Sequence, residues 1–519
     1  MVRRFNTVGP CQRDLHYILD PKERLPQVSQ VIDQAGYFWL HGPRQTGKTT
    51  ALSVLARDLT SRGKYAAVLV SAVAASVSAY EEAIAEDAFL YELQQSARVL
   101  PESLRPPQWE YQVPGQRIRA ALVAWAEACP RPLVIFIDDV DTLDERPLLS
   151  LLRQIAGGFA QRPHHFPQSI GFVGLREVDQ LPLPWGRRTN RQEWMTPGGL
   201  FHGMKGASFA LKTFTVEDVA NVYQKHTKAT GQLFTLEAVD RAFEVTQGQP
   251  WLVNVLANQI ITDTDEPIES YLIDTATEKL IQKQNTHIDH LVPRLWETRV
   301  QEIVEPLLMG QPLIHSTRED LAYALDVGIC CLDRYGGLML ANPIYQAIAL
   351  YHLSTPVLAS LTSVDPNIPT WVDFKGVINV QRVLEALLQL WQHQGDALLN
   401  TLPHKTIAPY LAISAFFWRV TQVHGTLSHT IELSKNRLQM AWKSGAGMVY
   451  VIVMVWRDHQ PDPLESGLTH LNKLINHKGG SLGWLVIIDQ RPERTTDGQR
   501  TRLESSQTAS GKSVAVLRG

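Results

Sequence analysis

A glycine-rich stretch near the start of the chain constrains its fold more than any other feature. The segment "HGPRQTGKTT" (His41–Thr50) follows the apolar run "YFWL" and leads into a stretch with the apolar spacing of a helix. A strand, a glycine-rich turn and a helix in this order make a loop whose backbone N–H groups can surround a phosphate. The chain is therefore expected to contain a nucleotide-binding α/β domain.

The residue types in this loop match that chemistry. Lys48 is expected to reach the β- and γ-phosphates of a nucleotide, and the hydroxyl of Thr49 is expected to ligate Mg²⁺. The glycines let the backbone wrap closely, and the start of the next helix adds favourable partial charge. A chance glycine-rich turn is the alternative, and the flanking strand and helix argue against it. The candidate nucleotide-binding residues are Gly42, Pro43, Arg44, Gln45, Thr46, Gly47, Lys48, Thr49 and Thr50.

A second segment, "LVIFIDDVDTL", is an apolar strand that ends in acids. Asp138 is the expected Mg²⁺ ligand opposite Thr49, because a carboxylate at the end of the neighbouring strand completes such a metal site. Asp139 stands where many ATPases carry a glutamate that activates the attacking water. Its side chain is one methylene shorter, so its catalytic role is expected to be weaker. The alternative is that Asp139 and Asp141 cap the next element.

Two further segments add candidates. The strand "SIGFVGLREV" is followed by Arg176, which is expected to sense the γ-phosphate, because a guanidinium binds phosphate with two donors. A surface salt bridge is the alternative for this arginine. In "TQGQPWLVN", Gly248 and Pro250 open a helix, which on its own is an ordinary helix start. The catalytic candidates are thus Asp139 and Arg176.

The pattern of apolar runs predicts an α/β fold with several parts. Continuous apolar strands separated by helices are typical of a parallel sheet that is covered on both faces. The expected parts are a P-loop ATPase core at 1–212, a helical lid at 213–290, a winged-helix-like domain at 291–360 and an α/β domain at 370–519. The segment "SLTSVDPNIPTW" is the expected linker, and "DQRPERTTDGQRTRLESSQTASGK" is expected to be a mobile loop before a last strand.

Composition excludes some functions. The formal net charge is -3, from 49 basic and 52 acidic residues, so the chain has no overall bias toward nucleic acid or membranes. The sequence has no signal-peptide core and no apolar run long enough to span a bilayer, which favours a cytoplasmic location. The four cysteines lack the spacing of a zinc site, and Cys330 and Cys331 are expected to be core residues.

Taken in order, these motifs resemble the signal-transduction ATPases with numerous domains (STAND) and their archaeal-type ATPase relatives, within the AAA+ class. The resemblance covers about residues 3–355 and is most specific in Gly42–Thr50 and Thr246–Asn254. It implies ATP and Mg²⁺ as ligands. It also implies an ATPase core with a helical lid and a winged-helix domain that close over the nucleotide. ATP would act as a conformational switch, with slow hydrolysis.

The same resemblance implies two further contacts. The Gly-x-Pro motif of that family approaches the nucleotide base, and here it corresponds to Gly248 and Pro250. In the segment before the P-loop, His16 and Tyr17 would help to hold adenine. The stretch "LFHGMKGASFALKTFT" departs from the family pattern, so no role is transferred to it.

Residues from about 370 to the end resemble a restriction-endonuclease-like PD-(D/E)XK domain. Aligned to that pattern, the metal-binding aspartate falls on Gln439, the Glu-x-Lys positions fall on Ile452 and Met454, and an upstream glutamate falls on Thr430. None of these side chains supplies a negative metal ligand. The strand "MVYVIVMVW" is wholly apolar, so it is expected to be a core strand of a degenerate, inactive domain.

The sequence thus favours an ATP-binding, slowly hydrolysing regulatory switch whose degenerate nuclease-like domain is used for docking. The alternative is an ATP-dependent nucleic-acid-binding protein in defence or mobile-element biology. A third hypothesis is a structural partner that no longer hydrolyses ATP. A protein partner is expected, its identity is unknown, and a nucleotide-dependent oligomer is compatible with the family.

Overall fold

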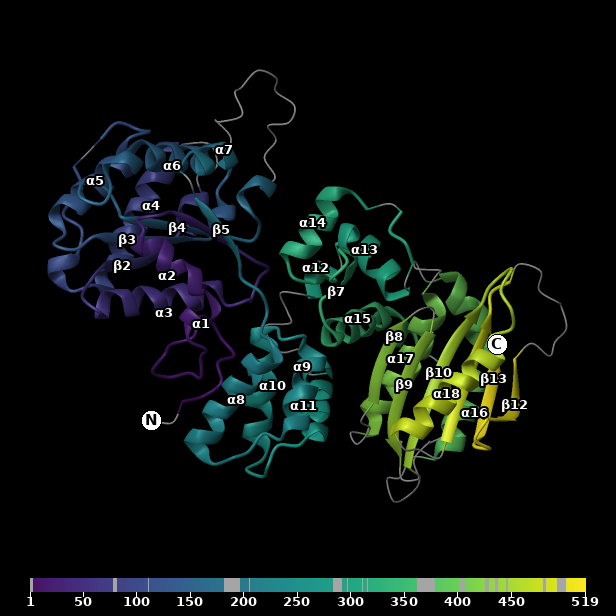
Figure 1. Ribbon diagram of the computed structural model, residues 1–519. Helices are drawn as coiled ribbons and strands as arrows, with labels where there is room; N and C mark the ends of the chain where they lie inside the picture. Colours follow the sequence, from purple (N-terminus) through teal and green to yellow (C-terminus); the bar gives the residue numbers. More distant parts are fainter. Residues whose placement is uncertain are drawn as a thin grey trace. The chain divides into compact units, whose positions relative to one another are not determined.

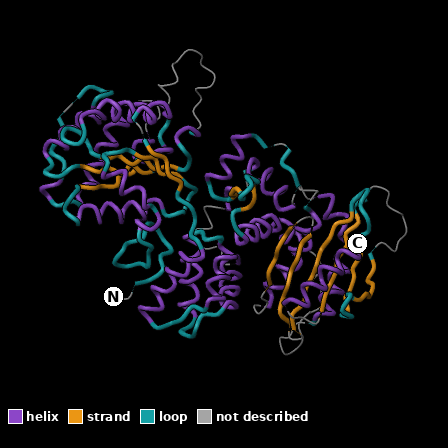
Figure 2. The backbone as a smooth tube through the Cα atoms, viewed as in Figure 1, coloured by secondary structure: helices purple, strands orange, loops and turns teal. Residues whose placement is uncertain are grey.

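The computed structural model describes residues 3–77, 82–110, 112–181, 197–204, 206–282, 292–295, 297–309, 311–314, 316–361, 379–401, 407–424, 429–434, 437–444, 447–478, 482–491 and 501–519. The chain divides into two compact units. The first comprises residues up to Phe243 together with Gln247–Ser270 and Leu325–Gly328. The second comprises Glu244–Thr246, Tyr271–Ala324 and Ile329–Gly519. Each unit contains a sheet of its own (Figures 1 and 2).

The sheet of the first unit is parallel throughout, with the strand order β2-β3-β4-β1-β5. Its strands are β1 (Phe38–His41), β2 (Ala66–Ser71), β3 (Leu133–Asp138), β4 (Ser169–Gly174) and β5 (Ala207–Ala210). Its helices are α1 (Pro21–Arg24), α2 (Pro26–Asp33), α3 (Lys48–Ser61), α4 (Glu82–Ser96), α5 (Arg117–Ala128), α6 (Glu145–Gly158) and α7 (Pro197–Gly203). Short 3-10 turns are η1 (Val73–Val77), η2 (Ala97–Val99), η3 (Glu102–Leu104), η4 (Val140–Thr142), η5 (Phe159–Gln161) and η6 (Val178–Gln180). The predicted parallel-sheet P-loop core is confirmed.

Helices cover both faces of this sheet (Figures 1 and 2). Phe38 packs in one core cluster and its neighbour Trp39 packs in the other, because successive strand residues point to opposite faces. All residues of β3 and β4 are buried, as expected of central strands in a doubly covered sheet. The carboxyl ends of β1, β3 and β4 therefore meet at one edge, where polar residues can reach a ligand.

The fifth strand, β5, was not predicted. It lies in the segment "LFHGMKGASFALKTFT" and pairs only with β1, along Ala207–Ala210. Its burial alternates between half-buried and exposed residues, which is typical of an edge strand. Its short, mixed composition left no apolar run that would distinguish it from a loop.

An all-helical region follows the core, as predicted. Its helices are α8 (Val216–Thr230), α9 (Leu236–Thr246), α10 (Pro250–Asp263) and α11 (Ser270–Gln282). Thr215 and Asp218 form a capping box at the start of α8, and Gly231 ends this helix in the left-handed conformation. We call α8 and α10, which lie in the first unit, the lid helices.

The second unit includes α11 from Tyr271 onward, and it continues with short helices, a hairpin and a longer helix. These elements are α12 (Val292–Leu295), α13 (Thr298–Met309), α14 (Arg318–Asp326), β6 (Cys330–Leu332), β7 (Leu338–Leu340) and α15 (Pro343–Leu361). The last two residues of α14 belong with the first unit. Strands β6 and β7 are antiparallel. Cys330 is buried as predicted, whereas Cys331 is half-buried. The winged-helix assignment stays a prediction, and all but the first two residues of the expected linker lie outside the described residues.

The sheet of the second unit is mixed, with the order β12-β13-β11-β10-β9-β8. Its strands are β8 (His429–Ser434), β9 (Arg437–Ser444), β10 (Gly447–Trp456), β11 (Leu482–Asp489), β12 (Arg502–Gln507) and β13 (Ser513–Arg518), and its helices are α16 (Val380–Thr401), α17 (Ala408–His424) and α18 (Leu464–Lys478). Strands β10, β11 and β13 are parallel, and β9 and β12 are antiparallel to their neighbours. Val449–Val453 in β10 are buried, so the predicted core strand is confirmed.

The predicted mobile loop before the last strand is wrong in part. Residues 492–500 lie outside the described residues, but Arg502–Gln507 form strand β12, which pairs antiparallel with β13. The hairpin is closed by Thr508 and Gly511, whose backbone groups bond each other. Since β12 is an edge strand with mostly polar residues, its composition resembles that of a loop.

Among the described residues, none of the helices has the length and apolar character needed to cross a membrane.

Candidate nucleotide-binding site

The glycine-rich loop joins the end of β1 to the start of α3. Gln45 and Gly47 adopt the left-handed conformation, with φ of 63° and 89°. At Gly42, a Cβ atom would lie 2.7 Å from the carbonyl oxygen of Leu211, so a larger residue would push the loop away from the core. The loop therefore has the tight, inward-curved backbone that the sequence predicts.

Lys48 folds back over this loop. Its Nζ donates hydrogen bonds to the carbonyl oxygens of Gly42 (2.6 Å) and Pro43 (2.8 Å). Burial lowers the pKa of Lys48, and the nearby carboxylate of Asp138 opposes that shift. The ammonium group is thus held by neutral carbonyls in a place where phosphate oxygens could take over its hydrogen bonds.

The two expected Mg²⁺ ligands are in direct contact. The hydroxyl of Thr49 donates to Oδ2 of Asp138 at 2.6 Å, and the backbone N–H of Asp139 donates to Oδ1 at 3.0 Å. Asp138 is only 3% exposed. Burial raises the pKa of Asp138, and the charge of Asp139 adds to the rise. A buried carboxylate beside a hydroxyl suits Mg²⁺, because the ion supplies the positive charge that offsets desolvation.

The two neighbouring acids have different surroundings. Asp139 is exposed, has a φ of 57°, and its Oδ2 accepts a hydrogen bond from the hydroxyl of Ser71 (3.1 Å). Its side chain makes no cap bond to η4, so the alternative role as a side-chain cap is not seen. Asp141, for which the sequence suggested only a cap on the next element, accepts a hydrogen bond from the N–H of Leu175 (3.2 Å) and so fixes the end of β4.

Arg176 lies just after β4 and forms an ion pair with Asp326. Both side chains are largely buried, with 15% and 14% of their surface exposed. The backbone oxygen of Arg176 accepts a bond from Nε1 of Trp39 (2.8 Å), which fixes its position at the edge of the sheet. The guanidinium thus has an acidic partner, although the pair is less exposed than the surface salt bridge considered as the alternative.

The Gly-x-Pro segment begins lid helix α10. Gly248 has a φ of 68°, and a Cβ atom there would lie 1.9 Å from the carbonyl oxygen of Phe214, so only glycine fits. The side chain of Gln249 caps the helix by accepting from the N–H groups of Trp251 (2.8 Å) and Leu252 (3.1 Å). Its Nε2 also donates to Oε1 of Gln45 in the loop, at 3.3 Å. Buried Pro250 occupies the first helical turn.

The segment before the P-loop packs on both α3 and α8. The N–H of Cys11 donates to the hydroxyl of Thr50 at 3.1 Å, so this side chain anchors the segment. Tyr17 is buried, and its ring packs against Phe5 and against His226 of α8. His16 is also buried, and its Nδ1 accepts a bond from the N–H of Gln12 (2.8 Å).

Sequence reasoning missed Arg24, Gln249 and Asp326 as residues of this region. Arg24 bonds the carbonyl of Thr46, Gln249 bonds Gln45, and Asp326 pairs with Arg176. Each contact joins two segments that are separated in the chain, and neither Arg24 nor Asp326 belongs to a motif. A capping residue could have been predicted at Gln249 from the helix start that follows it.

In the second unit, the register aligns the positions assigned by the nuclease resemblance. Gln439 of β9 pairs with Ile452 of β10, and Glu432 of β8 pairs with Gln439 from the other side. Thr430, the position assigned to an upstream glutamate, pairs with Ala441 instead. Ile452 is fully buried. Within the part of the chain that the structure describes, no three His, Cys, Asp or Glu residues group in a way that could hold a metal ion.

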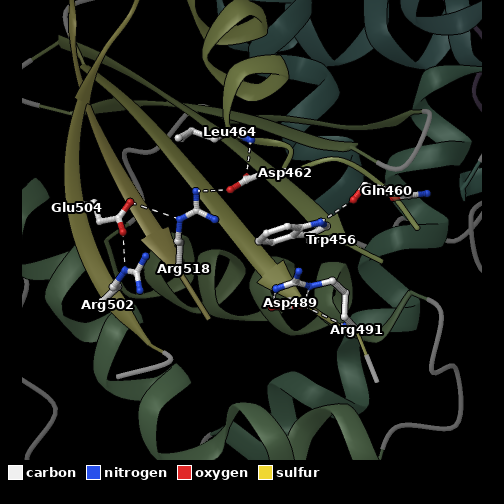
Figure 3. A network of polar contacts seen from close by, with 9 residues as sticks. All are labelled: Trp456, Gln460, Asp462, Leu464, Asp489, Arg491, Arg502, Glu504 and Arg518. Atoms are coloured by element: carbon white, nitrogen blue, oxygen red, sulfur yellow. Dashed lines mark hydrogen bonds and ion pairs between the residues drawn. The ribbon is translucent and has the colours of Figure 1, made fainter. Parts of the chain in front are cut away.

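A polar network lies at the carboxyl ends of β10, β11 and β13 (Figure 3). The guanidinium of Arg491 is 3.5 Å from the ring centre of Trp456 and forms two bonds with Asp489, at 2.9 and 2.7 Å. Arg518 bonds Asp462 at 2.8 Å. Glu504 bonds both Arg518 and Arg502. We call these residues, with Trp456, the edge network; each of its three arginines contacts a carboxylate.

Comparison with known proteins gives one family match: residues 25–164 match the AAA ATPase domain. No curated protein matches the chain by sequence. The solved structures similar to it include the Walker-type ATPase PABY2304 of Pyrococcus abyssi, at 13% identity over 66% of this chain and 99% of that chain, with a TM-score of 0.45. Cdc6p from Pyrobaculum aerophilum is 12% identical over 68% and 97% of the two chains, with a TM-score of 0.38. The RuvB Holliday junction branch migration motor of Thermotoga maritima is 13% identical over 62% and 90%, with a TM-score of 0.34.

The family match and the loop geometry agree. The matched residues include the loop, the Thr49–Asp138 contact and the central strands of the sheet. The first unit therefore contains an AAA-type P-loop ATPase domain that binds nucleotide. Such a domain typically uses Mg²⁺, and Thr49 and Asp138 are the residues that fit it.

Proposed function

We propose that this AAA-type ATPase domain works as a regulatory switch, in which bound ATP changes the conformation of the protein and hydrolysis is slow. The observation that carries the proposal is the arrangement around the loop. The ammonium group of Lys48 bonds the backbone of the glycine-rich loop, and Thr49 contacts Asp138. In this role, Mg²⁺ would neutralise phosphate charge, and Lys48 with the loop N–H groups would orient the β- and γ-phosphates.

A switch needs a contact that differs between its states, and the Arg176–Asp326 pair supplies a candidate. The γ-phosphate and the carboxylate of Asp326 are both anions that a guanidinium binds with two donors. They would therefore compete for Arg176. ATP would release Asp326, whereas ADP, which lacks the γ-phosphate, would leave the pair intact.

We expect slow hydrolysis because of Asp139, the residue proposed to activate the attacking water. Asp139 is exposed and bonded to Ser71, and its side chain is short for reaching a water in line with the γ-phosphate. Asp139→Glu should raise the turnover rate because the longer side chain extends toward that water. Equal or slower turnover would remove Asp139 from the proposed mechanism.

The test of the proposed function compares nucleotides. Binding of ATP, ADP and ATPγS is measured by calorimetry with Mg²⁺, and the conformation of each complex is followed by hydrogen exchange. ATP and ATPγS should bind and change the exchange around Arg176 and Asp326, and ADP should bind without that change. Identical exchange patterns for ADP and ATPγS would contradict the switch while leaving nucleotide binding intact.

We further propose that the sheet of the second unit is a degenerate nuclease-like domain used for docking to a protein partner. Support comes from the register, because the aligned positions Gln439 and Ile452 are direct neighbours and neither is an acid. Phosphodiester cleavage with Mg²⁺ needs anionic oxygen ligands. The full-length protein should therefore leave supercoiled DNA, linear DNA and RNA intact with Mg²⁺ or Mn²⁺.

Glu432 provides a control for this nuclease test, because the pairing of β8 with β9 places this acid opposite Gln439. If cleavage is seen and Glu432→Gln abolishes it, the degenerate assignment is wrong.

A salt titration of DNA binding separates the switch from the alternative, an ATP-dependent nucleic-acid-binding protein, because phosphate contacts weaken steeply with salt. Size measurements with and without ATPγS test for a nucleotide-dependent oligomer.

A further inference from the structure

Arg24 lies between the phosphate loop and the lid helices, although no motif includes it. Its Nη1 donates to the carbonyl oxygen of Thr46 at 3.1 Å, and its Nη2 donates to the carbonyl oxygen of Lys212 at 2.6 Å. Its guanidinium carbon also lies 4.8 Å from the ring centre of Phe214. One side chain therefore bonds the loop and the segment that leads into lid helix α8.

The contact with Thr46 bears on phosphate binding. In a trans peptide unit, the C=O and the following N–H point in opposite directions. When Arg24 holds the carbonyl of Thr46, it fixes the direction of the N–H of Gly47, away from the guanidinium and toward the opposite side of the loop backbone. Thr46 itself is 2% exposed, and its hydroxyl donates to the carbonyl of Pro43 (2.9 Å), so its side chain is held in place as well as its carbonyl.

The other contacts of Arg24 reach both lid helices. The N–H of Phe214 donates to the carbonyl oxygen of Gly248 at 2.7 Å, and Gly248 precedes α10. Phe214 also comes just before the capping box of α8. A displacement of Lys212 and Phe214 would therefore move the starts of α8 and α10 together. The bond between Gln249 and Gln45 adds a second link between the loop and α10.

We propose that Arg24 is a positioning residue that couples the phosphate loop to the lid helices. It would orient the Gly47 N–H for nucleotide and transmit the loop conformation to α8 and α10 through Lys212 and Phe214. This inference rests on the proposed function, since it assigns the residue that links nucleotide binding to the conformational change.

The charge of Arg24 is compatible with this role. Burial lowers the pKa of Arg24 to about 10, and the carboxylate of Asp218 in the first turn of α8 opposes the shift. The guanidinium is therefore protonated at neutral pH and can keep both hydrogen bonds. Asp218 also adds an electrostatic attraction between Arg24 and the lid.

A purely structural arginine would contribute stability without coupling, and Arg105 provides the matched control. Its Nε and Nη2 donate to the carbonyl oxygens of Leu100 (2.8 Å) and Arg98 (3.0 Å), so it also bridges two backbone carbonyls of the first unit. It contacts no residue of the loop or the lid helices in those bonds. Arg105→Ala should therefore lower stability without changing the response to nucleotide.

The experiment measures hydrogen exchange of the α8 and α10 amides in the full-length protein, with and without saturating ATPγS. In the wild type and in Arg105→Ala, ATPγS should protect these amides. In Arg24→Ala, ATPγS affinity should fall about tenfold, and at saturation at least about half of the protection should be lost. Arg24→Lys should recover affinity better than protection, because an ammonium keeps the charge but lacks the planar fork.

Two results would overturn the coupling role. One is full protection of both lid helices in Arg24→Ala at saturating ATPγS, and the other is complete recovery of protection in Arg24→Lys. If Arg24→Ala does not fold, Arg24→Lys alone decides between these outcomes. A wild type that fails to bind ATPγS would instead contradict the proposed function, which keeps the two failures distinct.

Discussion

The two sheets of this molecule both present polar residues at the carboxyl ends of parallel strands, but they neutralise them differently. In the first unit, the carboxyl ends of the parallel strands form what we call the first edge. There, Lys48 donates to backbone carbonyls, and Asp138 accepts from a hydroxyl and an N–H group. In the second unit, the carboxyl ends of β10, β11 and β13 form what we call the second edge. There, Arg491 and Arg518 contact carboxylates directly (Figure 3). The first edge keeps a cation and an anion on neutral partners, whereas the second pairs its charges internally.

This difference separates a ligand site from a structural network. A buried charge on neutral dipoles is only partly compensated, so phosphate or Mg²⁺ can improve its surroundings. A guanidinium that already forms two bonds with a carboxylate, as Arg491 does with Asp489, would have to exchange one anion for another. Position at the end of a parallel strand therefore does not suffice to make a site.

The largest expected effect is at the first edge. Lys48→Ala should lower ATP affinity about 100-fold, because it removes a charged donor from the β- and γ-phosphates. Its melting temperature should stay the same or rise, since burial already disfavours the charged form of Lys48. Calorimetry and thermal melting measure both values. Lys64→Ala, which removes an exposed partner of Asp33, is the control. An unchanged ATP affinity in Lys48→Ala would contradict the conclusion that the first edge is a ligand site and the second edge is not.

The next effect concerns Mg²⁺. Asp138→Asn should reduce the gain in ATP affinity that Mg²⁺ provides by about tenfold, because a neutral amide replaces an anionic ligand. Calorimetry with Mg²⁺ and with EDTA gives this ratio. An unchanged ratio would mean that another group holds the metal.

The same variant has a pH signature in the nucleotide-free protein. The folded-state pKa of Asp138 is raised, so the folded protein binds this proton more tightly than the unfolded chain does. The stability of the wild type should therefore fall as pH rises above 3.8, the ordinary pKa of an aspartate. Asp138→Asn should lack this contribution. As pH rises above that value, the melting temperature of the variant should therefore increase relative to that of the wild type. A constant difference would contradict the burial effect.

A smaller change is expected where the first edge does contain an ion pair. Asp326→Asn should raise ATP affinity about fivefold, because Arg176 loses the carboxylate that competes with the γ-phosphate. ADP affinity should stay the same. Glu319→Gln, an exposed acid on α14, is the control. Equal gains for ATP and ADP would show that Arg176 does not sense the γ-phosphate.

The smallest effect is expected at the second edge. Arg491→Ala removes a half-exposed ion pair and a contact with Trp456, which together contribute about 1 kcal/mol. Hydrogen exchange of the β10 and β11 amides should show that loss, and part of it should already be absent in high salt. ATP affinity should not change. A loss of several kcal/mol would mean that the edge network is far more than a set of surface pairs.

The core of the site could be predicted because its signals are local. Gly42–Thr49 and Asp138 each combine an apolar strand with a specific polar residue, and the structure brings Thr49 and Asp138 together. The parallel sheet followed from the apolar runs in the same way. By contrast, the edge strands β5 and β12 were missed, because a strand with one exposed side and few apolar residues resembles a loop.

The sequence by itself determined the phosphate loop, the acid opposite it and the order of the apolar strands and helices of the parallel sheet, because these depend on neighbours in the chain. Only the tertiary structure decided that Arg24 bonds Thr46, that Asp326 pairs with Arg176, and that Arg518 of the edge network pairs with Asp462. These pairings join residues separated by up to 150 positions, as in Arg176 and Asp326. Whether a charge is free for a ligand depends on what the fold brings beside it, and no local pattern encodes that.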